Sequence, residues 1–165
     1  MKAKDVIAQL NLEPLAGEGG YFMRSYLSDE TLPGGEGVSR PLASCIYYLI
    51  TADSFSTFHR LDADEIFHFY LGGPCEQVLL FPDGTGEKRI LGPDLARGQV
   101  VQSIVPKGAW QATKLLNPED DGWALFATTV HPAFEEGGFV LGEKEALLAQ
   151  YPDYREEFLD FFSEP

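Results

Sequence analysis

The sequence predicts an all-β fold, a sandwich or barrel with a short helical segment at each end, and three observations support this. From Tyr21 to Val130 the chain consists of short runs rich in β-branched and aromatic residues. Turn-forming residues, among them 17 Gly and 11 Pro in the whole chain, separate these runs. No long amphipathic helix alternates with the runs, so a parallel α/β fold is not expected.

The N-terminal segment, residues 2–12, is predicted to form a helix. Val6, Ile7 and Leu10 fall on one side at helical spacing, and Pro14 ends the helix. Strands are expected next, at 21–27, 44–51, 55–61, 65–71, 76–81, 88–91, 100–105, 111–115 and 123–130. Asp83-Gly84-Thr85-Gly86 is typical of a hairpin connection between two of them.

The C-terminal segment, about 143–162, returns to helical periodicity. Its apolar side chains form two stripes divided by Pro152, namely Leu147, Leu148 and Tyr151, then Tyr154, Phe158, Phe161 and Phe162. We expect these helices to cap the barrel.

The length and charge of the chain limit its organisation and its partners. A chain of 165 residues suits one domain spanning 1–165, with a barrel core at about 18–142 and the two helical segments flanking it. It carries 12 Lys and Arg against 26 Asp and Glu, a formal net charge of −14. Nucleic acids and anionic membranes attract clustered Lys and Arg, so neither is an expected partner.

Hydropathy and cysteine content indicate a cytoplasmic protein. The longest apolar run, residues 45–50, is far shorter than the roughly 20 residues that span a bilayer. The first residues lack the apolar core of a signal peptide. Without an export signal, Cys45 and Cys75 are expected to be reduced thiols.

His59 and Glu65 are the first candidates for chemistry. If 55–61 and 65–71 form an antiparallel hairpin, alternation places Thr57 and His59 on the same face as Glu65, Phe67 and Phe69. Burying an imidazole and a carboxylate among Phe and Leu side chains costs free energy unless they are paired, hydrated or bound to a ligand. The pair is therefore either a functional site or a satisfied structural pair in the barrel interior.

Two motifs resemble those of the cupin superfamily. His59, Glu65 and Gly72 follow the spacing of the first cupin motif, and Pro106-Lys107-Gly108-Ala109-Trp110-Gln111 resembles the second. Together with the segment EGGYFMRSY, they resemble a group of small single-domain cupins of unassigned function, similar in fold to the dTDP-sugar 3,5-epimerases. The resemblance implies a double-stranded β-helix, a jelly-roll-like barrel, in a homodimer that exchanges N-terminal strands.

The sequence departs from the cupin motifs at two metal positions. Leu61 stands where the second histidine of motif one would be, and Gln111 replaces the histidine of motif two. No cofactor is expected, because one imidazole, one carboxylate and one amide oxygen make a poor transition-metal site. A divalent ion, if one binds weakly, would use His59, Glu65 and Gln111.

The resemblance implies a pocket that binds a polar small molecule, sugar-like or carbonyl-containing. In it, His59 beside Glu65 would act as a general base for metal-independent isomerisation or epimerisation. Gln111 and Thr57 would bind polar groups of the ligand, and Phe67 and Phe69 would supply apolar walls. Two alternatives stay open: a non-catalytic ligand-binding cupin, and a metal-dependent lyase or oxygenase.

The position of a proton donor decides between catalysis and binding alone. A tyrosine opposite His59 would supply the acid, and Tyr21, Tyr47 and Tyr48 are the candidates. His68 falls on the opposite face from Glu65, unless a β-bulge near Asp64 reverses the alternation.

Overall fold

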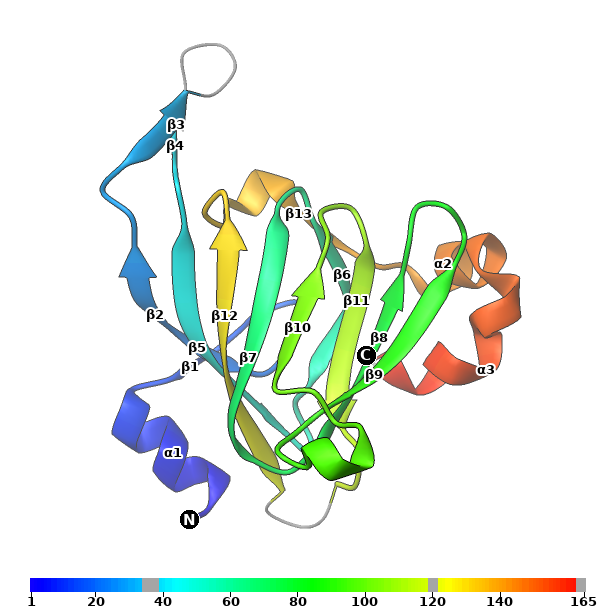
Figure 1. Ribbon diagram of the computed structural model, residues 1–165, viewed down its shortest axis with the longest axis horizontal. Helices are drawn as coiled ribbons and strands as arrows, with labels where there is room; N and C mark the ends of the chain where they lie inside the picture. Colours follow the sequence, from blue (N-terminus) through cyan, green and yellow to red (C-terminus); the bar gives the residue numbers. More distant parts are fainter. Residues whose placement is uncertain (34–38, 119–121, 163–165) are drawn as a thin grey trace.

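Two antiparallel sheets face one another in the computed structural model, which describes residues 1–33, 39–118 and 122–162 (Figure 1). The first sheet has the strand order β1 (Glu13–Pro14), β2 (Tyr21–Leu27), β5 (Ser44–Thr51), β12 (Trp123–His131), β7 (Asp64–Gly72) and β10 (Gln102–Val105). The second has the order β13 (Phe139–Leu141), β6 (Ser56–Leu61), β11 (Trp110–Leu115), β8 (Cys75–Leu80) and β9 (Gly86–Leu91). This arrangement confirms the predicted all-β barrel.

The predicted strands are confirmed to within a few residues at their ends, including the β8–β9 hairpin. Strands of two or three residues were missed, namely β1, β13 and the pair β3 (Thr31–Pro33) and β4 (Ser39–Pro41). β3 and β4 form a small arm that projects away from the two sheets (Figure 1). Short 3-10 turns lie at η2 (Leu95–Arg97), η3 (Glu136–Gly138), η4 (Pro152–Tyr154) and η5 (Leu159–Phe161).

The helices cover the outer faces of the sheets. α1 (Ala3–Leu10) packs Val6 against Leu49 and Leu125 of the six-stranded sheet. α2 (Lys144–Gln150) and α3 (Arg155–Phe158), with η5, pack on the five-stranded sheet, where Phe58 meets Phe158 with ring centroids 5.6 Å apart. The expected capping role of the C-terminal apolar stripes is confirmed. Within the described residues, none of the helices is long and apolar enough to cross a bilayer.

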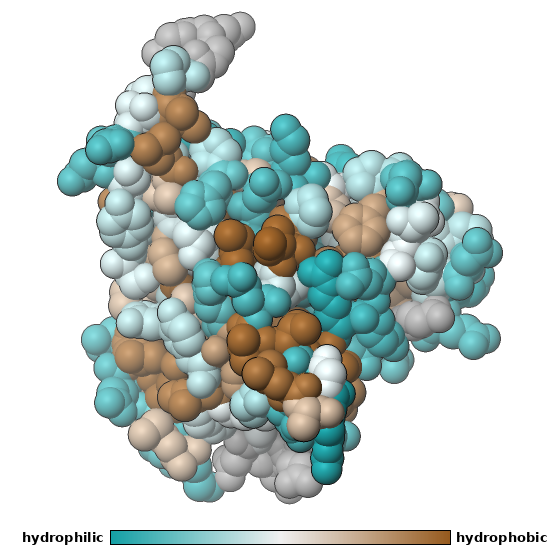
Figure 2. All heavy atoms as spheres, in the orientation of Figure 1, coloured by the Kyte–Doolittle hydropathy of each residue, from teal (hydrophilic) through white to brown (hydrophobic). Residues whose placement is uncertain are grey.

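The main core lies between the sheets and leaves part of the barrel interior unfilled. Phe67 and Phe69 pack edge-on against Phe126, with centroid distances of 5.7 and 5.6 Å. Around them the core cluster includes Tyr48, Ile50, Leu79 and Leu91. On the outside, Figure 2 shows hydrophobic residues in several separate places on the visible face rather than in one continuous patch.

The predicted hairpin of residues 55–61 and 65–71 is wrong. β6 pairs with β11 and β13 in one sheet, whereas β7 pairs with β12 and β10 in the other. The short turn at Asp62-Ala63 therefore carries the chain from one sheet to the facing one. His59 and Glu65 still point into the same interior, but they approach it from opposite sheets.

A register shift in β6 overturns the predicted orientation of Thr57. His59 lies opposite Gln111 and Ser56 lies opposite Thr113, so β6 has one residue more than β11 in this interval. Such a bulge interrupts the alternation of side chains between the two faces. Ser56 and His59 both contact Glu18, whereas the Thr57 hydroxyl donates to the carbonyl oxygen of Phe161 in the C-terminal cap, at 3.0 Å.

Candidate functional site

A cavity of about 410 Å³ opens between the two sheets and is lined by strands from both. Its apolar wall consists of Phe22, Ile46, Leu61, Val130, Phe134, Phe139 and the loop residues Leu15 and Ala16. Its polar side chains are Glu18, Arg24, Ser44, Tyr48, His59, Glu65, Thr128 and Glu136. Both residues predicted to carry the chemistry, His59 and Glu65, thus line one cavity.

The orientation of His59 is set by the strand that carries it. Its Nδ1 lies 2.9 Å from the carbonyl oxygen of Thr57, and because a carbonyl only accepts hydrogen bonds, Nδ1 carries the proton. In the neutral ring, Nε2 then presents a lone pair, 3.8 Å from a carboxylate oxygen of Glu18. The ring stacks on Phe139 at a centroid distance of 5.4 Å. Only 1% of His59 is exposed, yet the residue lines the cavity, as does Glu18, which Nε2 approaches.

Glu18 is a site residue that the sequence interpretation missed. One of its carboxylate oxygens accepts a hydrogen bond from Ser56 Oγ at 3.0 Å, and the other lies beside His59. Its flanking glycines have positive φ angles, 83° at Gly17 and 98° at Gly19, which other residues rarely adopt. The glycines on both sides of Glu18 let the backbone adopt the conformation that places its side chain at the cavity. This Gly-Glu-Gly sequence was the available indication that Glu18 is a site residue.

Tyr48 is the tyrosine that lines the cavity. Its hydroxyl donates to the carbonyl oxygen of Gly19 at 2.9 Å. Burial, and secondly the negative charge of Glu18, raise the pKa of Tyr48 well above its ordinary value, so the hydroxyl stays protonated at neutral pH. The other two candidates, Tyr21 and Tyr47, belong to the cluster beneath α1 on the outside of the sheet.

Glu65 lies in an environment that favours its neutral form. Burial raises the pKa of its carboxyl group, the nearby His59 lowers it, and the charge of Glu18 raises it again. One carboxyl oxygen accepts a hydrogen bond from Gln111 Nε2 at 2.6 Å. The buried amide oxygen Gln111 Oε1 has no hydrogen-bond partner among the described residues. Thr128 lines the cavity, and its hydroxyl lies close enough to Glu65 to lower the pKa of that carboxyl group, against the larger effect of burial.

Four residues predicted to bind the ligand do not line the cavity. Gln111 lies behind Glu65 and holds its carboxyl group instead of facing the cavity. Phe67 and Phe69 belong to the packed core, because the β7 residues beyond Glu65 run into the filled part of the barrel. Thr57 faces the C-terminal cap through the β6 bulge.

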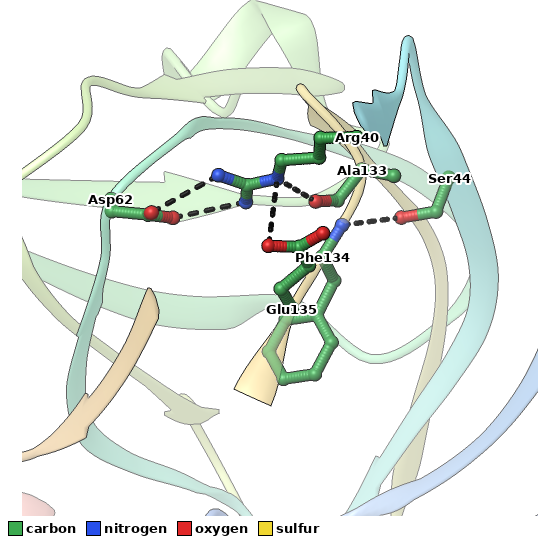
Figure 3. Close-up of polar contacts among 6 residues, drawn as sticks. All are labelled: Arg40, Ser44, Asp62, Ala133, Phe134 and Glu135. Carbon is green, nitrogen blue, oxygen red and sulfur yellow. Dashed lines mark hydrogen bonds and ion pairs between the residues drawn. The ribbon is translucent and has the colours of Figure 1, made fainter. Parts of the chain in front are cut away.

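The segment that follows β12 forms one wall of the cavity and is tied down by Arg40 of β4 (Figure 3). Arg40 donates from Nε to the carbonyl oxygen of Ala133 at 2.6 Å and binds both carboxylate oxygens of Asp62 at 3.0 Å. Next along the chain, the backbone N–H of Phe134 donates to Ser44 Oγ at 3.0 Å. These contacts fix the segment from which the side chain of Phe134 lines the cavity.

The donor set does not fit a transition metal. Among the described residues, no group of three or more His, Cys, Asp and Glu side chains is placed to hold a metal ion. His59 is the one imidazole of the cavity lining, and Leu61 fills the position of the second motif histidine. The amide of Gln111 turns its nitrogen, which cannot coordinate a cation, toward Glu65.

His68 lies on the outer face of its sheet, as the alternation predicted. Its Nδ1 is 3.3 Å from Gln102 Nε2, and its Nε2 is 3.3 Å from Thr129 Oγ1. It does not line the cavity, so it takes no direct part in the candidate site.

Comparisons with known proteins show which family and which solved structures this chain is similar to. A family model described as "Cupin superfamily (DUF985)" matches residues 4–142. An uncharacterized protein of Saccharomyces cerevisiae, YML079W, is 37% identical over 142 residues, covering 78% of this chain and 70% of that protein. The crystal structure of protein SO0799 from Shewanella oneidensis is 35% identical with a TM-score of 0.86, covering 100% of this chain and 99% of that chain. A hypothetical protein from Leishmania major is 25% identical with a TM-score of 0.88, covering 99% of this chain and 100% of that chain.

Proposed function

The chain belongs to the DUF985 family of the cupin superfamily, and on that premise we propose that its barrel binds a small carbonyl-containing metabolite, sugar-like or of similar polarity, and isomerises or epimerises it without a metal. His59 acts as the base and Tyr48 as the acid. The observation that carries the proposal is the fixed orientation of His59, whose Nδ1–H is held by Thr57 while Nε2 is left as an acceptor on the cavity side.

The proposed reaction is a proton transfer at the carbon next to the carbonyl group. His59 Nε2 removes a proton from that carbon, and the electron pair of the C–H bond forms an enolate. Glu18, 3.8 Å from Nε2, stabilises the imidazolium that results. Return of a proton from Tyr48 to the opposite face of the carbon gives the epimer, and the imidazolium restores the tyrosine proton through solvent. Where the deprotonated carbon carries a hydroxyl group, return of the proton to the former carbonyl carbon, with transfer of the hydroxyl proton to the former carbonyl oxygen, gives the isomer.

The cavity supports a ligand of small-metabolite size. Its volume of about 410 Å³ falls in the range of roughly 300–1,000 Å³ usual for small-molecule sites. Half of the lining residues are aliphatic or aromatic, and a carboxylate, Glu18, lies beside His59. A molecule with a carbonyl end and a partly apolar body matches this distribution.

Deuterium exchange tests the proposed proton transfer. We would incubate the protein in D₂O with glucose, glucose 6-phosphate, 4-oxopentanoate and 4-oxopentanamide, and follow loss of the C–H signals next to each carbonyl by proton NMR. Enzyme-dependent exchange is expected with at least one probe. His59→Asn should slow it at least about 100-fold, because loss of a general base costs roughly 10²–10⁴ in rate.

His68→Asn is the matched control, because His68 lies on the outer face of the barrel and should leave the exchange rate unchanged. Exchange that survives His59→Asn would remove His59 as the base. Binding of the probes with no exchange in any of them would contradict turnover and leave a non-catalytic ligand-binding cupin.

A further inference from the structure

Arg24 is a positively charged residue that lines the cavity but takes no part in the proposed reaction. It lies on β2 opposite Ile46 of β5, and Ile46 lies opposite Thr128 of β12. All three line the cavity, so Arg24 stands on the inner face of the six-stranded sheet. Its strand is near the edge of that sheet, since β1 pairs only with Tyr21 and Phe22.

The guanidinium of Arg24 has no partner within the described part of the chain, where no hydrogen bond, ion pair or ring contact involves it. Three of the other arginines bind a carboxylate: Arg40 binds Asp62, Arg89 binds Glu87 and Arg97 binds Asp94. Arg24 is also the one Lys or Arg side chain among the described residues that line the cavity. A planar guanidinium with unused donors matches the two oxygens of a carboxylate or phosphate group.

The charges of the cavity are separated in a way that orients such a ligand. Glu18 contacts Ser56 and His59, both of β6, and β6 belongs to the sheet that faces the one carrying Arg24. Facing sheets lie about 10 Å apart. An anionic group is repelled by the carboxylate beside His59 and attracted at the β2 side of the cavity. A neutral carbonyl end meets no such repulsion near His59.

We infer that the ligand carries an oxyanionic group, a carboxylate or a phosphate, which Arg24 binds while the carbonyl end lies at His59. The inference rests on the proposed function, because it names the substrate class of the same cavity. Arg24 is then the residue that selects charged over neutral metabolites and determines which end of the molecule meets the base.

Binding measurements on matched pairs of probes test this role of Arg24. The pairs are glucose 6-phosphate with glucose, and 4-oxopentanoate with 4-oxopentanamide, measured by isothermal titration calorimetry or NMR titration at constant ionic strength. For at least one pair, the anionic member should bind about 10- to 100-fold more tightly, as expected for a charge-assisted hydrogen-bonded contact. The pair that shows the preference distinguishes a phosphate from a carboxylate.

Arg24→Gln should reduce that preference to less than about threefold and leave the affinity for the neutral member unchanged. Arg97→Gln is the matched control: it removes the same charge from a side chain that is 83% exposed and does not line the cavity. The inference is overturned if no anionic probe binds, if the neutral members bind equally well, or if both variants weaken anion binding alike.

The outcome is separate from that of the exchange experiment. Arg24-dependent anion binding without deuterium exchange would contradict the proposed catalysis and uphold Arg24 as the anion site. Exchange of the neutral probes that equals exchange of the anionic ones would uphold the catalysis and overturn the role of Arg24.

Discussion

Glu65 shows how a single buried carboxyl group couples the stability of the fold to pH. Because burial raises the pKa of Glu65 in the folded state, the native protein binds its proton more tightly than the unfolded chain does. The resulting stabilisation is fully present below the ordinary carboxyl pKa of about 4.3 and is lost as the pH rises through the raised folded-state value. At neutral pH the charged form costs stability.

Glu65→Gln keeps the shape of the protonated carboxyl group and removes its titration. We expect the free energy of unfolding of this variant, relative to wild type, to increase between pH 4 and pH 7, as measured by urea unfolding at a series of pH values. Glu87→Gln is the control, and its stability relative to wild type should change with pH in the opposite direction. The reason is that the hydrogen bond from Arg89 lowers the pKa of Glu87. A variant that loses stability relative to wild type as the pH rises would contradict a raised pKa of Glu65.

Substitution of His59 tests whether the polar residues of the cavity bind a ligand or stabilise the fold. Its Nε2 faces a cavity large enough for several waters, so removal of the imidazole leaves Glu18 hydrated instead of stranded. His59→Ala should therefore change the free energy of unfolding by no more than about 1 kcal/mol. Urea unfolding of His59→Ala, Glu18→Ala, Glu65→Ala and the double variants would measure this.

A dry buried pair would behave differently. Each single variant would then lose roughly 3–5 kcal/mol, and the double variant with the true partner would recover much of it. The cycles with Glu18 and with Glu65 also show which carboxylate is coupled to His59. We expect His59 to be coupled to Glu18, which lies 3.8 Å from its Nε2, because Glu65 instead accepts a hydrogen bond from Gln111.

At the scale of elements, the wall formed by residues 133–139 depends on contacts from elsewhere in the chain. Arg40 connects β4, the Asp62 turn and Ala133 (Figure 3), and the backbone N–H of Asp62 donates to the carbonyl oxygen of Gly138. Within the wall itself, η3 is a single short turn. The position of Phe134 is thus imposed by Arg40 and Ser44.

Arg40→Gln should loosen this wall without unfolding the barrel. We expect amide hydrogen exchange of residues 133–139 to accelerate at least about tenfold and global stability to fall by about 1–2 kcal/mol, since the lost hydrogen bonds are partly exposed. Arg60→Gln is the control, because the guanidinium of Arg60 lies over the ring of Trp110 and, among the described residues, forms no side-chain hydrogen bond or ion pair with the wall. Equal acceleration throughout the protein would indicate general destabilisation instead of a local release.

At the scale of the whole molecule, β2 leaves a strand edge open. β1 pairs with Tyr21 and Phe22 only, and Tyr26 and Leu27 farther along β2 are exposed by 54% and 44%. Unpaired backbone groups beside exposed apolar side chains favour pairing with another chain. The homodimer implied by the cupin resemblance would cover this edge.

Light scattering should accordingly give about twice the chain mass of 18.3 kDa. Tyr26→Lys places a charge at the edge and should shift the protein toward the monomer, whereas Tyr70→Lys, at a residue 50% exposed on β7, should not. A wild-type monomer at micromolar concentration would contradict the interface and leave β2 paired only with its own sheet.

The sequence by itself determined the longer strands, the flanking helices and two polar residues that line the cavity. Strand positions follow from local composition and turn residues, which is why the segments from Tyr21 to Val130 were predicted nearly as they are. His59 and Glu65 were identified because an imidazole and a carboxylate are costly among apolar neighbours wherever they are buried. That reasoning needs no knowledge of which strands pair.

Only the tertiary structure decided how the strands pair and which polar residues meet. β6 and β7 are adjacent in sequence but pair with distant strands, and alternation along a strand carries no information about its partner. The bulge that turns Thr57 outward comes from a mismatch with β11, more than 50 residues away. Glu18 reaches His59 only because the barrel closes, joining residues 41 positions apart (59 − 18), so its role was set by long-range packing and not by local pattern.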